Sequence, residues 1–217
     1  MKSTLVKALL ISSLYCSAAW VSHAQANSDA PAVGDEQVTA GLLGKGYFNA
    51  SFLTERFRSS VEAKNGYGSN LGINLPATDN VDIGLAYTFE RVAATPRLTD
   101  NTVALSCTTY TTAAGMKPFA ALDFGYGWHR SVEENVASRD DRALFGAGGG
   151  LEVPVSTTTA IAGKATYNDS LRKGMAHVWT YTATVDHNLT ESIAARLDVL
   201  FHSKVSTTYD LGVVFLF

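Results

Sequence analysis

The sequence predicts an all-β fold, a membrane-spanning antiparallel up-and-down β-barrel of ten strands that follows a cleaved signal peptide. Short apolar segments alternate with polar residues along the chain, the N-terminus has the pattern of a secretory signal, and the last segment ends on the aromatic Phe217. Hydrophobic residues make up 46% of the chain and charged residues 17%. After the signal, no apolar run is long enough for a membrane helix, so strands must do the crossing.

Residues 1–26 have the pattern of a secretory signal peptide. Two lysines precede an apolar run over residues 8–21, and small residues place cleavage after Ala24 or after Ala26. Of the 17 basic residues of the chain, removal of these two lysines leaves 15 against 20 acidic residues, a formal charge of −5. This balance argues against nucleic acid as a partner.

Residues 27–44 are small and polar without a sustained period, and we expect a periplasmic N-terminal leader there. A plug or a short helix within this leader remains open, because residues 37–43 are too few to predict a helix from their pattern. Residues 45–217 form the predicted barrel.

Ten alternating segments can be found in the barrel region. The apolar and polar faces separate most completely in residues 81–90, 118–129, 192–202 and 209–217, and less completely in 47–57, 67–75, 102–112, 143–153, 159–167 and 177–185. Short turns over 76–80, 112–118, 154–158 and 187–191 alternate with longer predicted loops over 58–66, 91–101, 130–142 and 168–176. Eight strands are the alternative, if two of the weaker segments are loop.

Charged residues occupy the inward phase of these segments. A barrel of about eight strands has an interior that its own side chains nearly fill, and buried charges need partners or water. We therefore expect an ion-paired, hydrated charge network that closes the lumen. Its predicted members are Asp82, Glu90, Asp123, Glu152, Lys164, Asp186, Arg196, Asp198 and Asp210.

Three histidines, His129, His177 and His202, fall near one rim of the predicted barrel. A metal site would need at least two of them to converge. His129 and His202 are on the inward phase of strands that are not neighbours, and His177 shares its face with Trp179. Nothing in their spacing sets a nucleophile beside a base. We therefore expect no metal, no cofactor and no enzymatic activity.

The terminal strand, the signal peptide and the alternation over residues 47–217 resemble the small bacterial outer-membrane β-barrels, the OmpA/OmpX-type, porin-like group. The resemblance implies an outer-membrane location with lipid and lipopolysaccharide as surroundings. It also implies contact with the barrel-assembly machinery and periplasmic chaperones during biogenesis. In that group the alternating terminal strand is the assembly signal, which here comprises Tyr209, Leu211, Val213, Phe215 and Phe217.

Two functions fit this resemblance. The first is a non-enzymatic surface barrel with a largely filled lumen that supports envelope integrity or loop-mediated interactions, and the alternative is a small porin-like channel for ions or small polar solutes. In the predicted outer loops, residues 172–173 or 139–142 offer basic side chains for the phosphates of lipopolysaccharide, although Asp140 and Asp141 weaken the second candidate.

Overall fold

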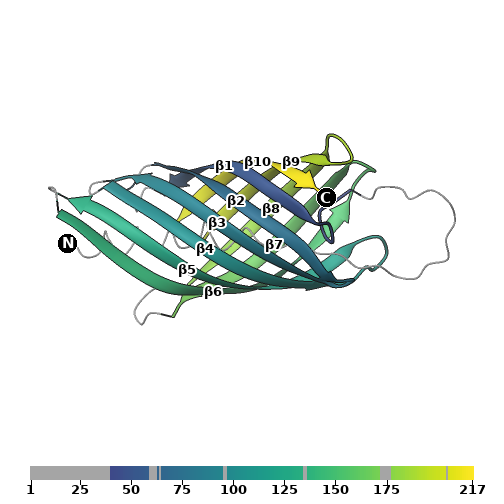
Figure 1. The fold of residues 1–217 in the computed structure, drawn as a ribbon, viewed down its shortest axis with the longest axis horizontal. Helices are drawn as coiled ribbons and strands as arrows, with labels where there is room; N and C mark the ends of the chain where they lie inside the picture. The colour runs from purple at the N-terminus through teal and green to yellow at the C-terminus, as the bar shows by residue number, and fades with distance from the viewer. Residues whose placement is uncertain are drawn as a thin grey trace.

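The computed structural model describes residues 40–58, 63, 65–94, 97–133, 136–171, 177–203 and 205–217, so the predicted signal peptide and most of the predicted leader lie outside it. Ten antiparallel strands form one closed barrel in which each strand pairs with its neighbours in the chain and β1 pairs with β10 (Figure 1). The predicted ten-stranded barrel is confirmed. The strands are β1 (Tyr47–Phe57), β2 (Asn65–Thr78), β3 (Val81–Ala93), β4 (Arg97–Tyr110), β5 (Lys117–Glu133), β6 (Val136–Pro154), β7 (Thr159–Ser170), β8 (Val178–Asn188), β9 (Ile193–His202) and β10 (Ser206–Leu216).

Along the strands, side chains alternate between the buried interior and the exposed exterior of the barrel. In β8 each second residue from Val178 to Asn188 is buried and those between them are exposed. In β5, Asp123 is 1% exposed while its neighbour Phe124 is 59% exposed. This placement, with a large aromatic ring outside and a carboxylate inside, is the inverse of the arrangement in a soluble protein. It suits a barrel surrounded by lipid. Within the described residues, no helix is long and apolar enough to cross a bilayer.

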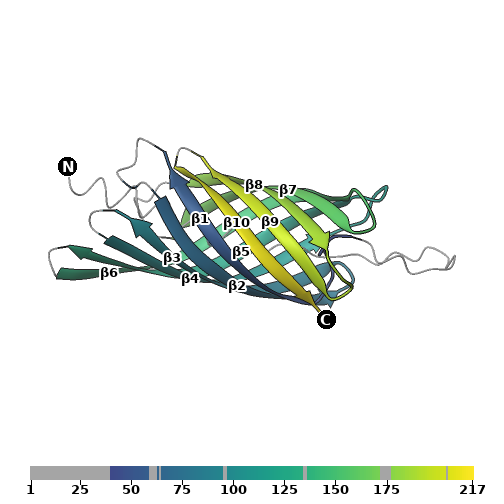
Figure 2. The ribbon, with the colours of Figure 1, turned by 90° about the horizontal axis from the view of Figure 1, so that it is seen from above.

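Two segments predicted as loops, 91–101 and 130–142, are largely strand, so this part of the prediction is wrong. β3 continues to Ala93, β4 begins at Arg97, and the β5–β6 hairpin pairs as far as Glu133 and Val136. This hairpin projects beyond the neighbouring strands (Figure 2). The charges that suggested loops do not end a strand, because a strand that leaves the membrane keeps its hydrogen-bond ladder without an apolar face.

The two rims of the barrel differ, as they do in outer-membrane barrels with short periplasmic turns. One rim, here called the turn end, has the short connections between β2 and β3, β4 and β5, β6 and β7, and β8 and β9. The other rim is called the loop end. Phe217 lies at the turn end, where its backbone N–H donates to the carbonyl oxygen of Gly46 at 3.0 Å, next to the first residue pair of the β1–β10 seam, Tyr47 and Leu216 (Figure 1).

Glycines on the inward side of β6 let neighbouring side chains approach its backbone. At Gly150 an added Cβ would overlap the carbonyl oxygen of Gly163 and would lie 2.5 Å from Cζ of Phe119. The Phe119 ring therefore covers Gly150, its register partner on β5. At Gly163, on the outward side of β7, an added Cβ would have no atom within 4 Å apart from its own neighbours in the chain.

We expect these two glycines to differ in their response to alanine. Gly150→Ala should lower the free energy of unfolding by about 1–3 kcal/mol, because the new methyl group meets backbone that must shift. Gly163→Ala should change it by less than about 0.5 kcal/mol, because the methyl group enters open space. Urea unfolding of the refolded barrel in lipid vesicles, followed by tryptophan fluorescence, measures both, and equal losses would contradict this account of Gly150.

Candidate functional site

The interior of the barrel is the candidate site, because the chain concentrates its buried charges there. Every predicted member of the lumen charge network is buried: Asp82, Glu90, Asp123, Glu152, Lys164, Asp186, Arg196, Asp198 and Asp210. The structure distributes them over separate groups of contacts on different strands. The role of these groups remains a prediction.

Arg196 of β9 is the centre of one group. Its Nε and Nη2 donate to the two carboxylate oxygens of Asp186, its register partner on β8, at 2.8 and 2.9 Å. Nε also lies 4.0 Å from Asp198, whose carboxylate accepts a hydrogen bond from Thr184. The Tyr47 ring centroid is 5.8 Å from the guanidinium carbon. A two-pronged pair of this kind fixes the guanidinium plane while it neutralises the charge.

Lys164 of β7 forms a second group with Asp123 of β5, at 3.4 Å between Nζ and Oδ2. The lysine must pass over β6, and Gly146 is the register partner of Asp123 there. A Cβ at Gly146 would lie 3.3 Å from the Asp123 carboxylate and 2.9 Å from Oδ1 of Asn168. The space beside this inward glycine is therefore occupied by polar side chains of the neighbouring strands.

Arg142 and Asp100 form a third ion pair, at 3.1 Å, that the sequence analysis missed. Both side chains are buried, and they join β6 to β4 across Gly127 of β5. They were missed because they fell in segments predicted as loops. Extending the period of two would have found them, since Asp100 is in phase with Thr102 and Arg142 with Leu144.

The remaining predicted charges have other surroundings. Glu152 lies 3.6 Å from Nζ of Lys117 on the neighbouring strand, and Asp82 accepts a hydrogen bond from Asn74. Glu90 approaches Glu55 over Gly66, where an added Cβ would meet both carboxylates. Asp210 is the register partner of Asp198. Lys117 and Glu55 are further buried charges of the interior, beyond the predicted members of the network.

The turn end of the lumen is occupied by residues 40–46, which precede β1. Leu42 and Leu43 have no exposed surface. The backbone N–H of Leu42 donates to Glu152 Oε2 at 3.3 Å, and Lys117 Nζ donates to the Leu43 carbonyl at 3.3 Å. The plug that the sequence left open is therefore present in this described part of the leader. Burial, followed by the nearby charge of Lys117, lowers the pKa of Lys45.

Apolar packing seats this turn-end plug, as we call residues 40–46. Leu43 packs against Tyr110 and Phe119. Leu42 packs in a separate cluster with Tyr47, Ala194 and Val214. Gly41 has a φ of +105°, and a Cβ there would overlap Glu152 Oε1. Glycine at this position is what allows the chain to turn against the carboxylate.

An apolar cluster fills the interior near the loop end. Its members face one another across the barrel from several strands and their flanking segments: Phe57, Ala63, Val92, Leu98, Leu144, Val178 and Val205. We call this set the loop-end cluster. The alternation of the sequence does not predict this cluster, because most of its members lie at or beyond the ends of the predicted segments.

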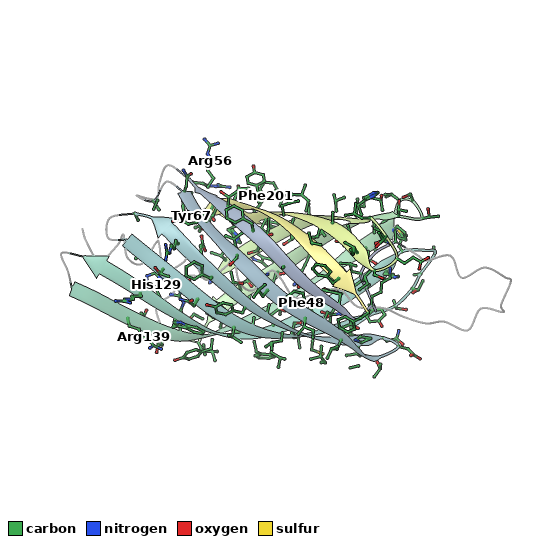
Figure 3. All side chains as sticks on the ribbon, turned by 45° about the horizontal axis from the view of Figure 1, so that its top comes forward. Phe48, Arg56, Tyr67, His129, Arg139 and Phe201 are labelled. Carbon is green, nitrogen blue, oxygen red and sulfur yellow. The ribbon has the colours of Figure 1, made fainter. Side chains whose placement is uncertain are left out.

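The three histidines do not come together. His202 is enclosed between the hydroxyls of Thr180 and Thr208, at 3.1 and 3.2 Å. His129 is buried in the interior, and Figure 3 places it near the loop end. His177 is exposed against the Tyr167 ring at 5.5 Å between centroids. The residues that the structure describes contain no group of three histidine, cysteine or acidic side chains that could hold a metal ion.

The predicted assembly signal lies on the outward face at the end of the chain. Tyr209, Leu211, Val213, Phe215 and Phe217 are all exposed. The Phe215 ring stacks on Phe48 of β1 at 6.3 Å between centroids, across the seam. Recognition of this strand by an assembly machinery remains a prediction.

No protein-family model matches the chain, and no curated protein sequence matches it. Solved structures do. The translocator domain of the autotransporter NalP from Neisseria meningitidis has a TM-score of 0.50 at 11% identity, over 80% of this chain and 88% of that one. Neisserial surface protein A has 0.47 at 12% identity, over 79% and 97%. The N-terminal β-barrel domain of Pseudomonas aeruginosa OprF has 0.42 at 14%, over 80% and 100%.

The likeness to the NalP translocator domain concerns the fold alone. Large apolar side chains cover the outside of a closed barrel whose backbone groups pair from strand to strand. The chain therefore has the fold of an outer-membrane β-barrel, with an exterior suited to lipid.

Proposed function

We propose that the protein is a non-enzymatic surface barrel with a closed lumen, which supports envelope integrity or acts through its outer loops. The observation that carries this proposal is the complete burial of Leu42 and Leu43 inside the turn end. A chain segment that packs its leucines into the mouth of a barrel leaves no room there for a solute.

Two further layers support a closed lumen. In the middle, long basic side chains reach acids on neighbouring strands or two strands away, as Lys164 does with Asp123. Near the loop end, the loop-end cluster presents apolar side chains to the axis. Water that crosses such a layer gives up hydrogen bonds, so apolar packing opposes a continuous polar path.

The alternative is a small porin-like channel for ions or small polar solutes. One observation favours it: the turn end is closed by a segment before β1, whose polar anchors to β5 and β6 include the contacts with Lys117 and Glu152. Departure of that segment would open the turn end onto a charged interior. The two functions therefore differ in whether the turn-end plug stays in place.

The proposal also includes the partners of such a barrel. Outer-membrane lipid and lipopolysaccharide would surround the apolar exterior. The alternation of exposed apolar side chains along β10 supports recognition by the barrel-assembly machinery and by periplasmic chaperones during biogenesis.

We expect the refolded mature barrel to be silent in a planar bilayer, because three layers of side chains close its lumen. Single-channel recording measures this, with heat-modifiable gel mobility to confirm that the sample has folded. Stable openings of nanosiemens size from the folded protein would overturn the closed lumen and select the channel.

A thiol at Leu43 should be protected if the turn-end plug stays seated. In a chain with Cys16 and Cys107 replaced by serine, Leu43→Cys should react with a water-soluble maleimide at least about 100-fold more slowly than Met116→Cys. Met116 is the matched control, because it is 38% exposed in a turn at the same end. Similar labelling rates for the two thiols would show that the plug leaves the lumen freely.

Each interior ion pair should stabilise the barrel only when both of its partners are present. Lys164→Met should lower the free energy of unfolding by about 3 kcal/mol, because it leaves the buried Asp123 carboxylate without its ammonium partner. Adding Asp123→Leu should recover most of that loss, because the unpaired carboxylate is then gone. Urea titrations in lipid vesicles compare the two variants, and a double variant no more stable than Lys164→Met would exclude this electrostatic role.

A further inference from the structure

A row of arginines lies on the exterior of the barrel near the loop end. Arg91 of β3 is the register partner of Thr99 on β4, Thr99 is the partner of Arg130 on β5, and Arg130 is the partner of Arg139 on β6. All three arginines are exposed. We call Arg91, Arg130 and Arg139 the arginine row. Figure 3 shows the Arg139 side chain projecting away from the barrel.

Aromatic side chains lie directly below the arginine row on the same outward face. Two residues along each strand toward the middle of the membrane, the register sets Phe89, Asn101 and Trp128 side by side. The Trp128 ring also contacts Tyr87 and Tyr126 at 6.3 and 6.4 Å between centroids. Aromatic girdles mark the interface between hydrocarbon and headgroups. The arginine row therefore lies at the headgroup level of the leaflet at the loop end.

The arginine row has more positive charge than its neighbours compensate. Arg130 and Arg139 face each other across a β-ladder, an arrangement of like charges that destabilises a sheet. Asp141 neutralises one of them, with 2.7 Å between its Oδ1 and Arg139 Nε. Arg91 lies 5.5 Å from the Phe89 ring centroid, and Arg130 has no ion pair within the described residues. A bound anion at this level would offset the repulsion.

We infer that the arginine row is a binding site for the phosphate groups of lipopolysaccharide in the outer leaflet. The loop end of an outer-membrane barrel faces outward, so the leaflet beside the row is the one that holds this phosphorylated glycolipid. A guanidinium group can donate two parallel hydrogen bonds to the oxygens of one phosphate. Neighbouring strands lie about 4.8 Å apart. The Cα atoms of Arg91 and Arg130, two strands apart, therefore lie about 10 Å from each other.

The distribution of charge supports one face of the barrel as the site. Among the lysines and arginines whose side chains the structure describes, the exposed ones are all arginines near the loop end: Arg56, Arg58, Arg91, Arg130 and Arg139. On β7 and at β8, the next strands around the barrel, the described outward residues near the same rim include Asp169, His177 and Trp179. This inference does not depend on whether the lumen conducts, because the arginine row lies outside the lumen.

The test compares two double variants of the full mature chain. Arg91→Gln with Arg130→Gln removes two charges from the arginine row, and Arg56→Gln with Arg58→Gln removes two exposed charges from β1 and its flank at the same end. The barrels are held in phosphatidylcholine nanodiscs, and binding of added lipopolysaccharide is titrated by fluorescence at fixed salt. Heat-modifiable mobility confirms that each variant has folded.

We expect the row variant to bind lipopolysaccharide about 30-fold more weakly than the wild type, since each basic residue near an anionic lipid surface contributes about a factor of five. The control variant should lose less than about threefold. Equal losses in the two variants would show a diffuse charge effect and overturn the site. Unchanged binding of dephosphorylated lipopolysaccharide would overturn phosphate as the ligand, and equal competition by phosphatidylglycerol would overturn lipopolysaccharide as its source.

Discussion

The hydrogen-bond seam between β1 and β10 is the constraint on which the rest of this structure depends. Lipid offers no partners for backbone N–H and carbonyl groups, so a membrane sheet must close on itself. Here the seam runs from the pair Tyr47 and Leu216 to the pair Phe57 and Ser206 without a register shift. Closure with ten strands leaves a narrow interior. The inward side chains must therefore fill that space and satisfy one another.

Two ion pairs satisfy this demand with the same arrangement. A long basic side chain crosses a glycine on the middle strand and reaches an acid two strands away, as Lys164 reaches Asp123 over the glycine-rich β6 and Arg142 reaches Asp100 over Gly127. The glycine provides the room, and the pair ties three consecutive strands together. Inward glycines in this barrel are thus sites of close packing between neighbouring strands.

The sequence predicted the strands and their faces because lipid imposes a period of two, as in β8, where the alternation is unbroken. That period predicted that Asp123 and Lys164 both point into the barrel. Their pairing depends on the register of β6 between them, and this register is set by long-range contacts. The polar extensions that hold Asp100 and Arg142 were missed because lipid no longer selects apolar side chains there. The path of Leu42 and Leu43 has no period from which it could be predicted.

The position of the turn-end plug has a consequence for the order in which this barrel can be completed. Leu42 packs against Tyr47 of β1, Ala194 of β9 and Val214 of β10, and the carbonyl of Gly46 holds the N–H of Phe217. The two partners of the seam are thus also two walls of the leucine pocket. Seating of residues 40–46 and pairing of the first and last strands are therefore coupled, because the leucine pocket is complete only when the seam has formed.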